Sequence, residues 1–214
     1  MRYRYQTLEF RDFDIHLRTL RDRQQFHDPD QEAERLGISS AAWSLAGVLW
    51  PAGQVLAHHL EGLDTQGQRI LEIGCGIGLA SLVLNHRRAD ISATDLHPAS
   101  GPSLRRNAAL NEDPEIPFAQ LAWEDGASLL GTFDLVIGSD ILYEAGHVDL
   151  VSAFILAHCE PRCTVILVDP GRGHHARFSK AMVARGFDHA QHPPDMDARL
   201  SAPFKGQILR YHRA

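Results

Sequence analysis

One short segment combines an acid with three alternating glycines: Glu72-Ile73-Gly74-Cys75-Gly76-Ile77-Gly78. Glycine adopts positive φ angles easily and lets a ligand approach the backbone, so this spacing predicts a tight turn that cradles a small molecule. A dinucleotide fingerprint does not fit, because its last small residue would fall on Leu79 or Ser81. The carboxylate at 72 would also repel a pyrophosphate, whereas it would favour a ligand that carries a positive charge.

The elements around this turn follow a regular alternation. Residues 3–10 and 13–18 predict a hairpin, residues 21–40 predict a polar loop with a short helix, and Pro51 suits the first turn of a helix that ends near Leu60. From residue 69 onward, short apolar segments alternate with helical ones. We expect strands at 69–73, 90–95, 117–123, 133–140, 164–169 and 206–213, and helices at 78–86, 98–111, 147–159 and 176–186.

This alternation predicts an α/β fold with a doubly wound, mostly parallel sheet and helices on both faces. Ligands of such sheets bind at the carboxyl ends of the strands. The residues just past each expected strand are therefore the candidates for a site: 72–78, Asp95, Trp123-Glu124, 140–143 and 169–172. We expect an N-terminal extension over residues 1–47, serving as a lid or acceptor-recognition element, and one domain over 48–214.

Composition excludes several classes of protein. The 214 residues include 21 Lys and Arg against 27 Asp and Glu, a formal net charge of −6, so a chain-wide basic surface for nucleic acid is not expected. No apolar run reaches the roughly 18 residues of a membrane span, and the N-terminus lacks the apolar block of a secretory signal. We therefore expect a cytoplasmic protein. Neither a metal-ligand motif nor a G-x-S-x-G elbow is present, so we expect no metal and no hydrolase.

The glycine turn resembles motif I of the class I S-adenosylmethionine-dependent methyltransferases. Asp140-x-x-Tyr143, the segment 49–52 (LWPA) and the segment 107–111 (NAALN) resemble the seven-strand protein lysine methyltransferases, family 16. The segment 169–172 (DPGR) is similar to one in the electron-transfer-flavoprotein lysine methyltransferase branch. A bacterial group described as nicotinamide N-methylase-like shares much of the pattern, which covers roughly residues 48–172. The resemblance implies a seven-stranded Rossmann-like sheet.

It also implies S-adenosyl-L-methionine as the cofactor. Asp95 takes the position of the acid that binds the ribose hydroxyls, since a carboxylate accepts two hydrogen bonds from a diol; it could instead cap the next helix. Trp123 stands near the adenine-contacting position, or it is an ordinary core side chain. The expected cofactor-binding residues are Trp50, Glu72, Gly74, Cys75, Gly76, Gly78, Asp95, Leu96, Trp123 and Ser139.

Asp140 and Tyr143 take the position that faces the transferable methyl group, and we expect them to be catalytic. Residues 141 and 142 are not prolines, unlike the Asn/Asp-Pro-Pro-Tyr/Phe motif of nucleic-acid and glutamine amino-methylases. Asp140 could anchor an ammonium and then hold the neutral amine, although a carboxylate alone favours the charged form. Asp140 could instead contact only the amino group of the cofactor, and Tyr143 could only pack.

Arg172 and Asp169 are the remaining expected substrate-binding residues. A guanidinium binds carboxylates bidentately, so Arg172 could hold an acidic substrate; a structural ion pair is equally consistent. Asp169 could instead be a strand-end cap or an ion-pair partner, which are commoner roles for such an acid than catalysis. The resemblance implies an N-methyltransferase that acts on a protein lysine. The alternatives are methylation of a small, nicotinamide-like molecule and a non-catalytic module that only binds S-adenosylmethionine.

Overall fold

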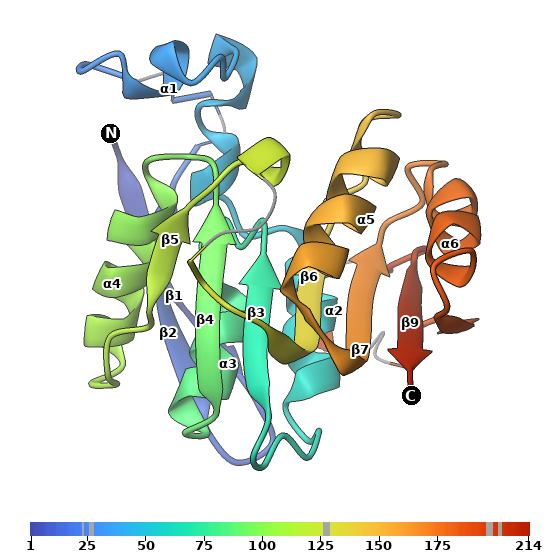
Figure 1. Cartoon of the computed structure of the whole chain (residues 1–214). Coiled ribbons are helices and arrows are strands. Elements are labelled where there is room, and N and C mark those ends of the chain that lie inside the picture. Colours follow the sequence, from blue (N-terminus) through green and yellow to red (C-terminus); the bar gives the residue numbers. More distant parts are fainter. Residues whose placement is uncertain (23, 26–27, 126–128, 196–198, 201–202) are drawn as a thin grey trace.

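A seven-stranded sheet forms the centre of the computed structural model, which describes residues 1–22, 24–25, 28–125, 129–195, 199–200 and 203–214 (Figure 1). The strand order is β5-β4-β3-β6-β7-β9-β8. The first five of these are parallel, and β9 runs antiparallel to both β7 and β8. This confirms the doubly wound, mostly parallel sheet. The strands are β3 (Arg69–Ile73), β4 (Asp90–Asp95), β5 (Phe118–Gln120), β6 (Phe133–Ser139), β7 (Cys159–Asp169), β8 (Asp188–His192) and β9 (Gln207–Arg213).

Helices cover both faces of the sheet, because successive strand residues point to opposite sides. Ile70 of β3 lies in one core cluster with Leu56 and Leu82, whereas its neighbour Leu71 lies in the other with Phe154. The helices of the first face are α2 (Pro51–Leu60), α3 (Leu79–His86) and α4 (Ser100–Leu110), and those of the second are α5 (His147–His158) and α6 (His175–Val183). Among the described residues, none of these helices is long and apolar enough to cross a bilayer.

The N-terminal hairpin packs on the first face, behind the sheet in Figure 1. It consists of β1 (Tyr3–Glu9) and β2 (Asp14–Leu20), paired antiparallel as the sequence predicts. The backbone N–H of His16 donates to Asn111 Oδ1 (2.7 Å), and that of Arg18 donates to Asn107 Oδ1 (2.8 Å). Asn107 of α4 and Asn111, the C-cap of that helix, thus bind backbone N–H groups on the outer edge of β2, while Ile15 is fully buried in the first core.

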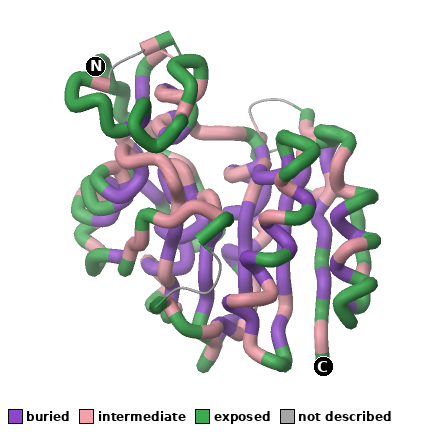
Figure 2. The backbone as a smooth tube through the Cα atoms, turned by 45° about the horizontal axis from the view of Figure 1, so that its top comes forward, coloured by how far each residue is buried: buried purple, intermediate pink, exposed green. Residues whose placement is uncertain are grey.

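The segment between the hairpin and α2 extends beyond the carboxyl ends of β4 and β5 (Figure 1). It holds α1 (Glu32–Arg35) and two 3-10 turns, η1 (Ser40–Ala42) and η2 (Leu45–Gly47). Figure 2 shows that the part carrying α1 is largely exposed, in contrast to the buried strands at the centre. The segment therefore lies on the side of the sheet where ligands of this fold bind.

Two expected strands differ from the structure, and one strand is found that the sequence does not predict. The strand expected at 117–123 ends at Gln120, and Trp123 begins a 3-10 turn, η3 (Trp123–Asp125). The strand expected at 164–169 already begins at Cys159. The edge strand β8 was not predicted, because its polar, mostly exposed residues (DHAQH) lack the apolar alternation of a buried strand.

Candidate functional site

The glycine turn between β3 and α3 has positive φ angles at Gly74, Gly76 and Gly78 (61°, 55° and 71°). A Cβ on Gly74 would lie 2.8 Å from Ile141 Cγ2, and a Cβ on Gly78 would overlap Leu104. These two glycines are thus required for packing. A Cβ on Gly76 would have only the carbonyl oxygen of Ala46 nearby, at 3.6 Å. Gly76 is therefore the glycine whose exposed side leaves room for a ligand to approach the backbone.

Glu72 is buried beneath this turn and faces the helix that follows it. Its Oε2 accepts hydrogen bonds from the backbone N–H of Ser81 (2.9 Å) and from the Ser81 hydroxyl. A carboxylate in the first turn of a helix also interacts favourably with the helix dipole. Burial raises the pKa of Glu72 to about 7. Glu72 thus fixes the geometry between β3 and α3, and its partner Ser81 is a residue that the sequence analysis missed.

Asp95, at the end of β4, fixes the other side of the turn. Its Oδ2 accepts a hydrogen bond from Gly76 N–H (2.7 Å), and its Oδ1 accepts one from His97 N–H (2.8 Å). It does not cap α4, because that helix begins at Ser100 with Ala99 as its N-cap. Burial raises the pKa of Asp95. Each oxygen retains acceptor capacity, so the carboxylate suits a ligand with paired hydroxyl groups.

Trp123 lies beside the glycine turn. A Cβ on Gly74 would be 3.4 Å from Trp123 Cζ2, and the indole meets the His147 ring edge-to-face with centroids 4.9 Å apart. His147 also contacts the Tyr143 ring edge-to-face at 4.3 Å, and its Nδ1 is 3.0 Å from the carbonyl oxygen of Ile141. Sequence analysis missed His147, because a histidine that opens a helix carries no distinguishing pattern. Its ring joins Trp123 and Tyr143 into one aromatic wall.

Asp140 follows β6 and pairs with Arg172, which follows β7. Arg172 Nε donates to Asp140 Oδ1 (2.9 Å), and a terminal Arg172 nitrogen donates to Oδ2 (2.7 Å). This two-point ion pair raises the pKa of Arg172. The structure thus places Arg172 in the ion-pair alternative. The φ angle of Asp140 is 54°, a left-handed conformation that costs roughly 1 kcal/mol for a residue other than glycine.

Asp169 stabilises the turn that carries Arg172. The Asp169 side chain is 3% exposed, and its Oδ1 accepts a hydrogen bond from Gly171 N–H at 2.8 Å. His175 Nδ1 is 3.6 Å from the same oxygen. These contacts are those of a strand-end cap, which the sequence offers as an alternative to substrate binding.

The other expected residues surround this group. Cys75 is buried, burial raises the pKa of its thiol well above the ordinary value, and its backbone N–H donates to the carbonyl of Thr94. The indole N–H of Trp50 donates to the carbonyl of Leu45 (3.0 Å), just before α2. The carbonyl of Leu96 accepts from Gln120 Nε2 (3.1 Å) beside Asp95. Ser139 ends β6 against Gly53 of α2, and Tyr143 is 52% exposed.

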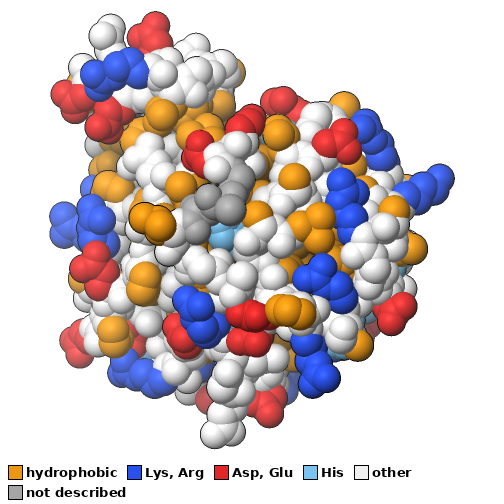
Figure 3. Space-filling view, viewed as in Figure 1, with side chains coloured by type: hydrophobic (Ala, Val, Ile, Leu, Met, Phe, Trp, Pro, Cys, Tyr) orange, Lys and Arg blue, Asp and Glu red, His pale blue; other side chains and the backbone are white. Residues whose placement is uncertain are grey.

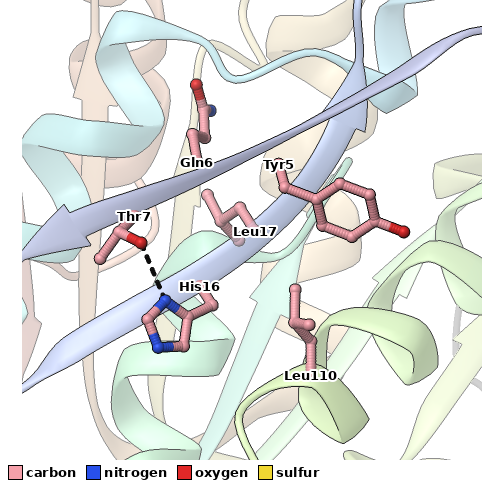
Figure 4. Close-up of a pocket in the computed structure, with 6 residues that line it drawn as sticks. All are labelled: Tyr5, Gln6, Thr7, His16, Leu17 and Leu110. Atoms are coloured by element: carbon pink, nitrogen blue, oxygen red, sulfur yellow. Dashed lines mark hydrogen bonds between the residues drawn. The ribbon is translucent and has the colours of Figure 1, made fainter.

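Two surface features lie apart from this site. A cavity of about 230 Å³ is formed between the hairpin and α4 and is lined by Tyr5, Gln6, Thr7, His16, Leu17 and Leu110 (Figure 4). A Thr7–His16 hydrogen bond of 2.9 Å closes one side of it. On the face seen in Figure 3, basic and acidic side chains are interspersed. No lining residue of the cavity belongs to the glycine turn.

The sheet order, the glycine turn and the acid at the end of β4 define a class I S-adenosylmethionine-dependent methyltransferase. A family model described as lysine methyltransferase matches residues 31–182, and the chain belongs to this family. The family, the enzyme class and the cofactor expected from the sequence are thus confirmed.

Two curated relatives are named as lysine methyltransferases. The chain is 30% identical over 182 residues to an electron transfer flavoprotein beta subunit lysine methyltransferase of Xenopus laevis, a match that covers 80% of this chain and 68% of the relative. It is 31% identical over 120 residues to the protein N-lysine methyltransferase METTL21A of Danio rerio. That match covers 53% of this chain and 52%, about half, of the relative.

Solved structures share the fold at low sequence identity. Magnesium protoporphyrin IX methyltransferase of Synechocystis PCC 6803 with bound S-adenosylmethionine aligns with a TM-score of 0.56 and 20% identity, covering 89% of this chain and 86% of that one. The 16S rRNA N2 G1207 methyltransferase of T. thermophilus aligns with a TM-score of 0.60 and 15% identity, covering 99% and 51%. At such identities the likeness supports the fold alone.

Proposed function

We propose that this methyltransferase acts on the ε-amino group of a lysine side chain in a protein. The observation that carries the proposal is the position of Asp140. It directly follows β6, and the next residue, Ile141, packs against Gly74 of the glycine turn. A carboxylate held there suits an amine acceptor. The two relatives described above are both named as lysine methyltransferases, which favours a lysine over other amines.

The residues around the turn fit the cofactor. The open side of Gly76 would admit the cofactor close to the backbone, the Asp95 carboxylate would accept hydrogen bonds from the ribose hydroxyls, and the Trp123 indole would cover the adenine. When bound, the cofactor supplies an electrophilic methyl group on a sulfonium sulfur. The lone pair of the amine forms the new N–C bond as the C–S bond breaks, and the electron pair of that bond goes to sulfur.

Asp140 and Tyr143 then act on the acceptor. An incoming lysine is protonated, since its ordinary pKa is about 10.4, and must release that proton to water before it can attack. The Asp140 carboxylate accepts from the N–H groups of the amine and directs its lone pair, and the half-exposed Tyr143 ring forms a wall of the entrance. The enzyme thus contributes mainly alignment of the two reacting groups.

Transfer of labelled methyl groups tests the proposal. The enzyme is incubated with methyl-labelled S-adenosylmethionine and either the protein fraction or the small-molecule fraction of a lysate from cells that lack it. We expect label in a protein, recovered as methyl-lysine after hydrolysis. Asp140→Ala should abolish the labelling. Asp149→Ala removes another aspartate that pairs with an arginine, here Arg177 by a single contact on the open surface, and should have no effect. Label confined to the small-molecule fraction would overturn the choice of a protein acceptor.

A further inference from the structure

An unpaired carboxylate is a poor neighbour for an amine that must be neutral. A negative charge close to an ammonium stabilises its protonated form and raises its pKa. If Asp140 faced the lysine alone, it would bind the substrate well but hold it in the unreactive form. Any group that offsets the charge of Asp140 while leaving its oxygens able to accept hydrogen bonds would remove this conflict.

Arg172 is placed to do this. Strands β6 and β7 are parallel neighbours, with Ser139 beside Val168, so residues 140 and 172 leave the same edge of the sheet. The backbone N–H of Asp140 donates to the carbonyl of Val168 (2.9 Å), and the turn before Arg172 is fixed by the Asp169–Gly171 hydrogen bond. Both partners of the ion pair are therefore held by backbone contacts as well as by each other.

The two-point contact leaves part of the carboxylate free. The guanidinium takes one acceptor position on each Asp140 oxygen, at 2.9 and 2.7 Å, and each oxygen has a second. The Asp140 side chain is 13% exposed, so a substrate can still reach it, whereas Arg172 is 45% exposed. Such a pair offers hydrogen-bond acceptors with little net charge.

Other charged or titratable groups also surround the pair. They come from the elements packed near it: Asp95 at the end of β4, Tyr143 and Glu144 in the loop after β6, His147 in α5, Asp169 of β7 and His175 in α6. Within the described residues of this set, Arg172 is the group in direct contact with both Asp140 oxygens. Its removal should therefore change the charge at Asp140 more than any other single substitution.

The geometry points to Arg172 as a positioning residue that acts through Asp140, offsetting its charge so that the bound amine is held in its neutral, nucleophilic form. This inference rests on the proposed amine acceptor. Arg172, in the segment after β7, would then act on the protonation of the substrate. This differs from the alternative in which Arg172 binds an acidic substrate directly.

The pH dependence of methyl transfer tests it. Initial rates are measured from pH 6.5 to 10 for wild type, Arg172→Gln and Arg172→Lys, with labelled S-adenosylmethionine and whichever lysate fraction the wild type labels. In Arg172→Gln the uncompensated charge of Asp140 should raise the pKa of the bound amine. We therefore expect the rising part of the pH–rate profile to shift to higher pH by about one unit, so that the rate approaches the wild-type rate only at high pH. Arg172→Lys keeps the positive charge but loses the two-point contact of the guanidinium. The rising part of its pH–rate profile should stay near that of wild type, and its maximal rate should be lower.

A merely structural role predicts something different, namely a rate lowered by the same factor at every pH. That result, in variants whose thermal unfolding and cofactor affinity match wild type, would overturn the inference. The pH profiles can be measured with whichever lysate fraction the wild type labels. Label in small molecules would therefore refute the protein acceptor, but the profiles would still test the role of Arg172. Label in neither fraction would overturn both proposals.

Discussion

The carboxylate of Asp95 accepts a hydrogen bond from the backbone N–H of Gly76 at 2.7 Å, across 19 residues of sequence. This contact joins the ends of the neighbouring strands β3 and β4 and holds the glycine turn in its left-handed conformation. Asp95, proposed to bind the ribose, and Gly76, proposed to lie against the cofactor, are therefore coupled. A substitution at either residue should alter the position of the other.

The first prediction concerns Asp95 itself. Asp95→Ala removes both the acceptor for the ligand hydroxyls and the partner of Gly76 N–H, and we expect affinity for S-adenosylmethionine to fall at least tenfold, about 1.4 kcal/mol. Asp95→Asn keeps one acceptor oxygen and should lose less. Isothermal titration measures both. Affinity of the alanine variant within twofold of wild type would contradict the role of Asp95.

The glycines of the turn should separate binding from packing. Gly76→Ala places a methyl group in the open space and should weaken cofactor binding more than it lowers stability. Gly74→Ala should mainly destabilise the fold, because its Cβ would lie 2.8 Å from Ile141. Gly67→Ala is the control, since Gly67 has a φ of 72° but nothing within 4 Å of a Cβ. Isothermal titration and thermal unfolding of all three variants test this prediction. Equal losses of cofactor affinity and of stability in the Gly74 and Gly76 variants would contradict it.

Glu72 predicts a specific pH dependence of stability. Its pKa is raised by burial from 4.5 to about 7 in the folded protein, so the folded state binds the proton more tightly than the unfolded chain does. The resulting stabilisation is complete below pH 4.5 and is lost as the pH rises to about 7. Glu72→Gln lacks this dependence. Relative to wild type, the unfolding free energy of the variant should rise across this window by about 3 kcal/mol.

Urea unfolding of both proteins between pH 4 and 8.5 measures this difference. All other titrating groups are shared, so the difference between the two curves reports residue 72 and its charge interaction with Asp95. Parallel stability curves would show that Glu72 titrates near its ordinary value.

The attachment of the hairpin depends on α4. Asn111→Ala removes the hydrogen bonds from His16 N–H (2.7 Å) and to the His16 carbonyl (2.8 Å), and we expect it to lower the unfolding free energy by about 1–2 kcal/mol. Hydrogen exchange should become faster at residues 14–20. Arg105→Ala, on the exposed part of the same helix, should change neither. Unchanged exchange in the Asn111 variant would mean that apolar packing alone holds the hairpin.

Local patterns in the sequence determined most of the elements and the turn at their centre. The segment 90–95 was predicted as a strand with its observed ends, and α2 was predicted from Pro51 to Leu60, because apolar periodicity and the fixed φ of proline act over a few residues. The alternating glycines predicted a turn with positive φ angles for the same local reason. The edge strand β8 carries no such pattern, since pairing with β9 alone defines it.

Tertiary structure decided what each acid of the site faces. From the sequence, Glu72, Asp95, Asp140 and Asp169 are four similar carboxylates at strand ends. In the structure Glu72 binds Ser81, and Asp140 binds a guanidinium 32 residues away. Periodicity tells which face of an element is apolar, but the partner of a polar side chain depends on which distant residue the sheet order brings beside it. The partner of Asp140 is therefore decided by the pairing of β6 with β7, which brings Arg172 beside it.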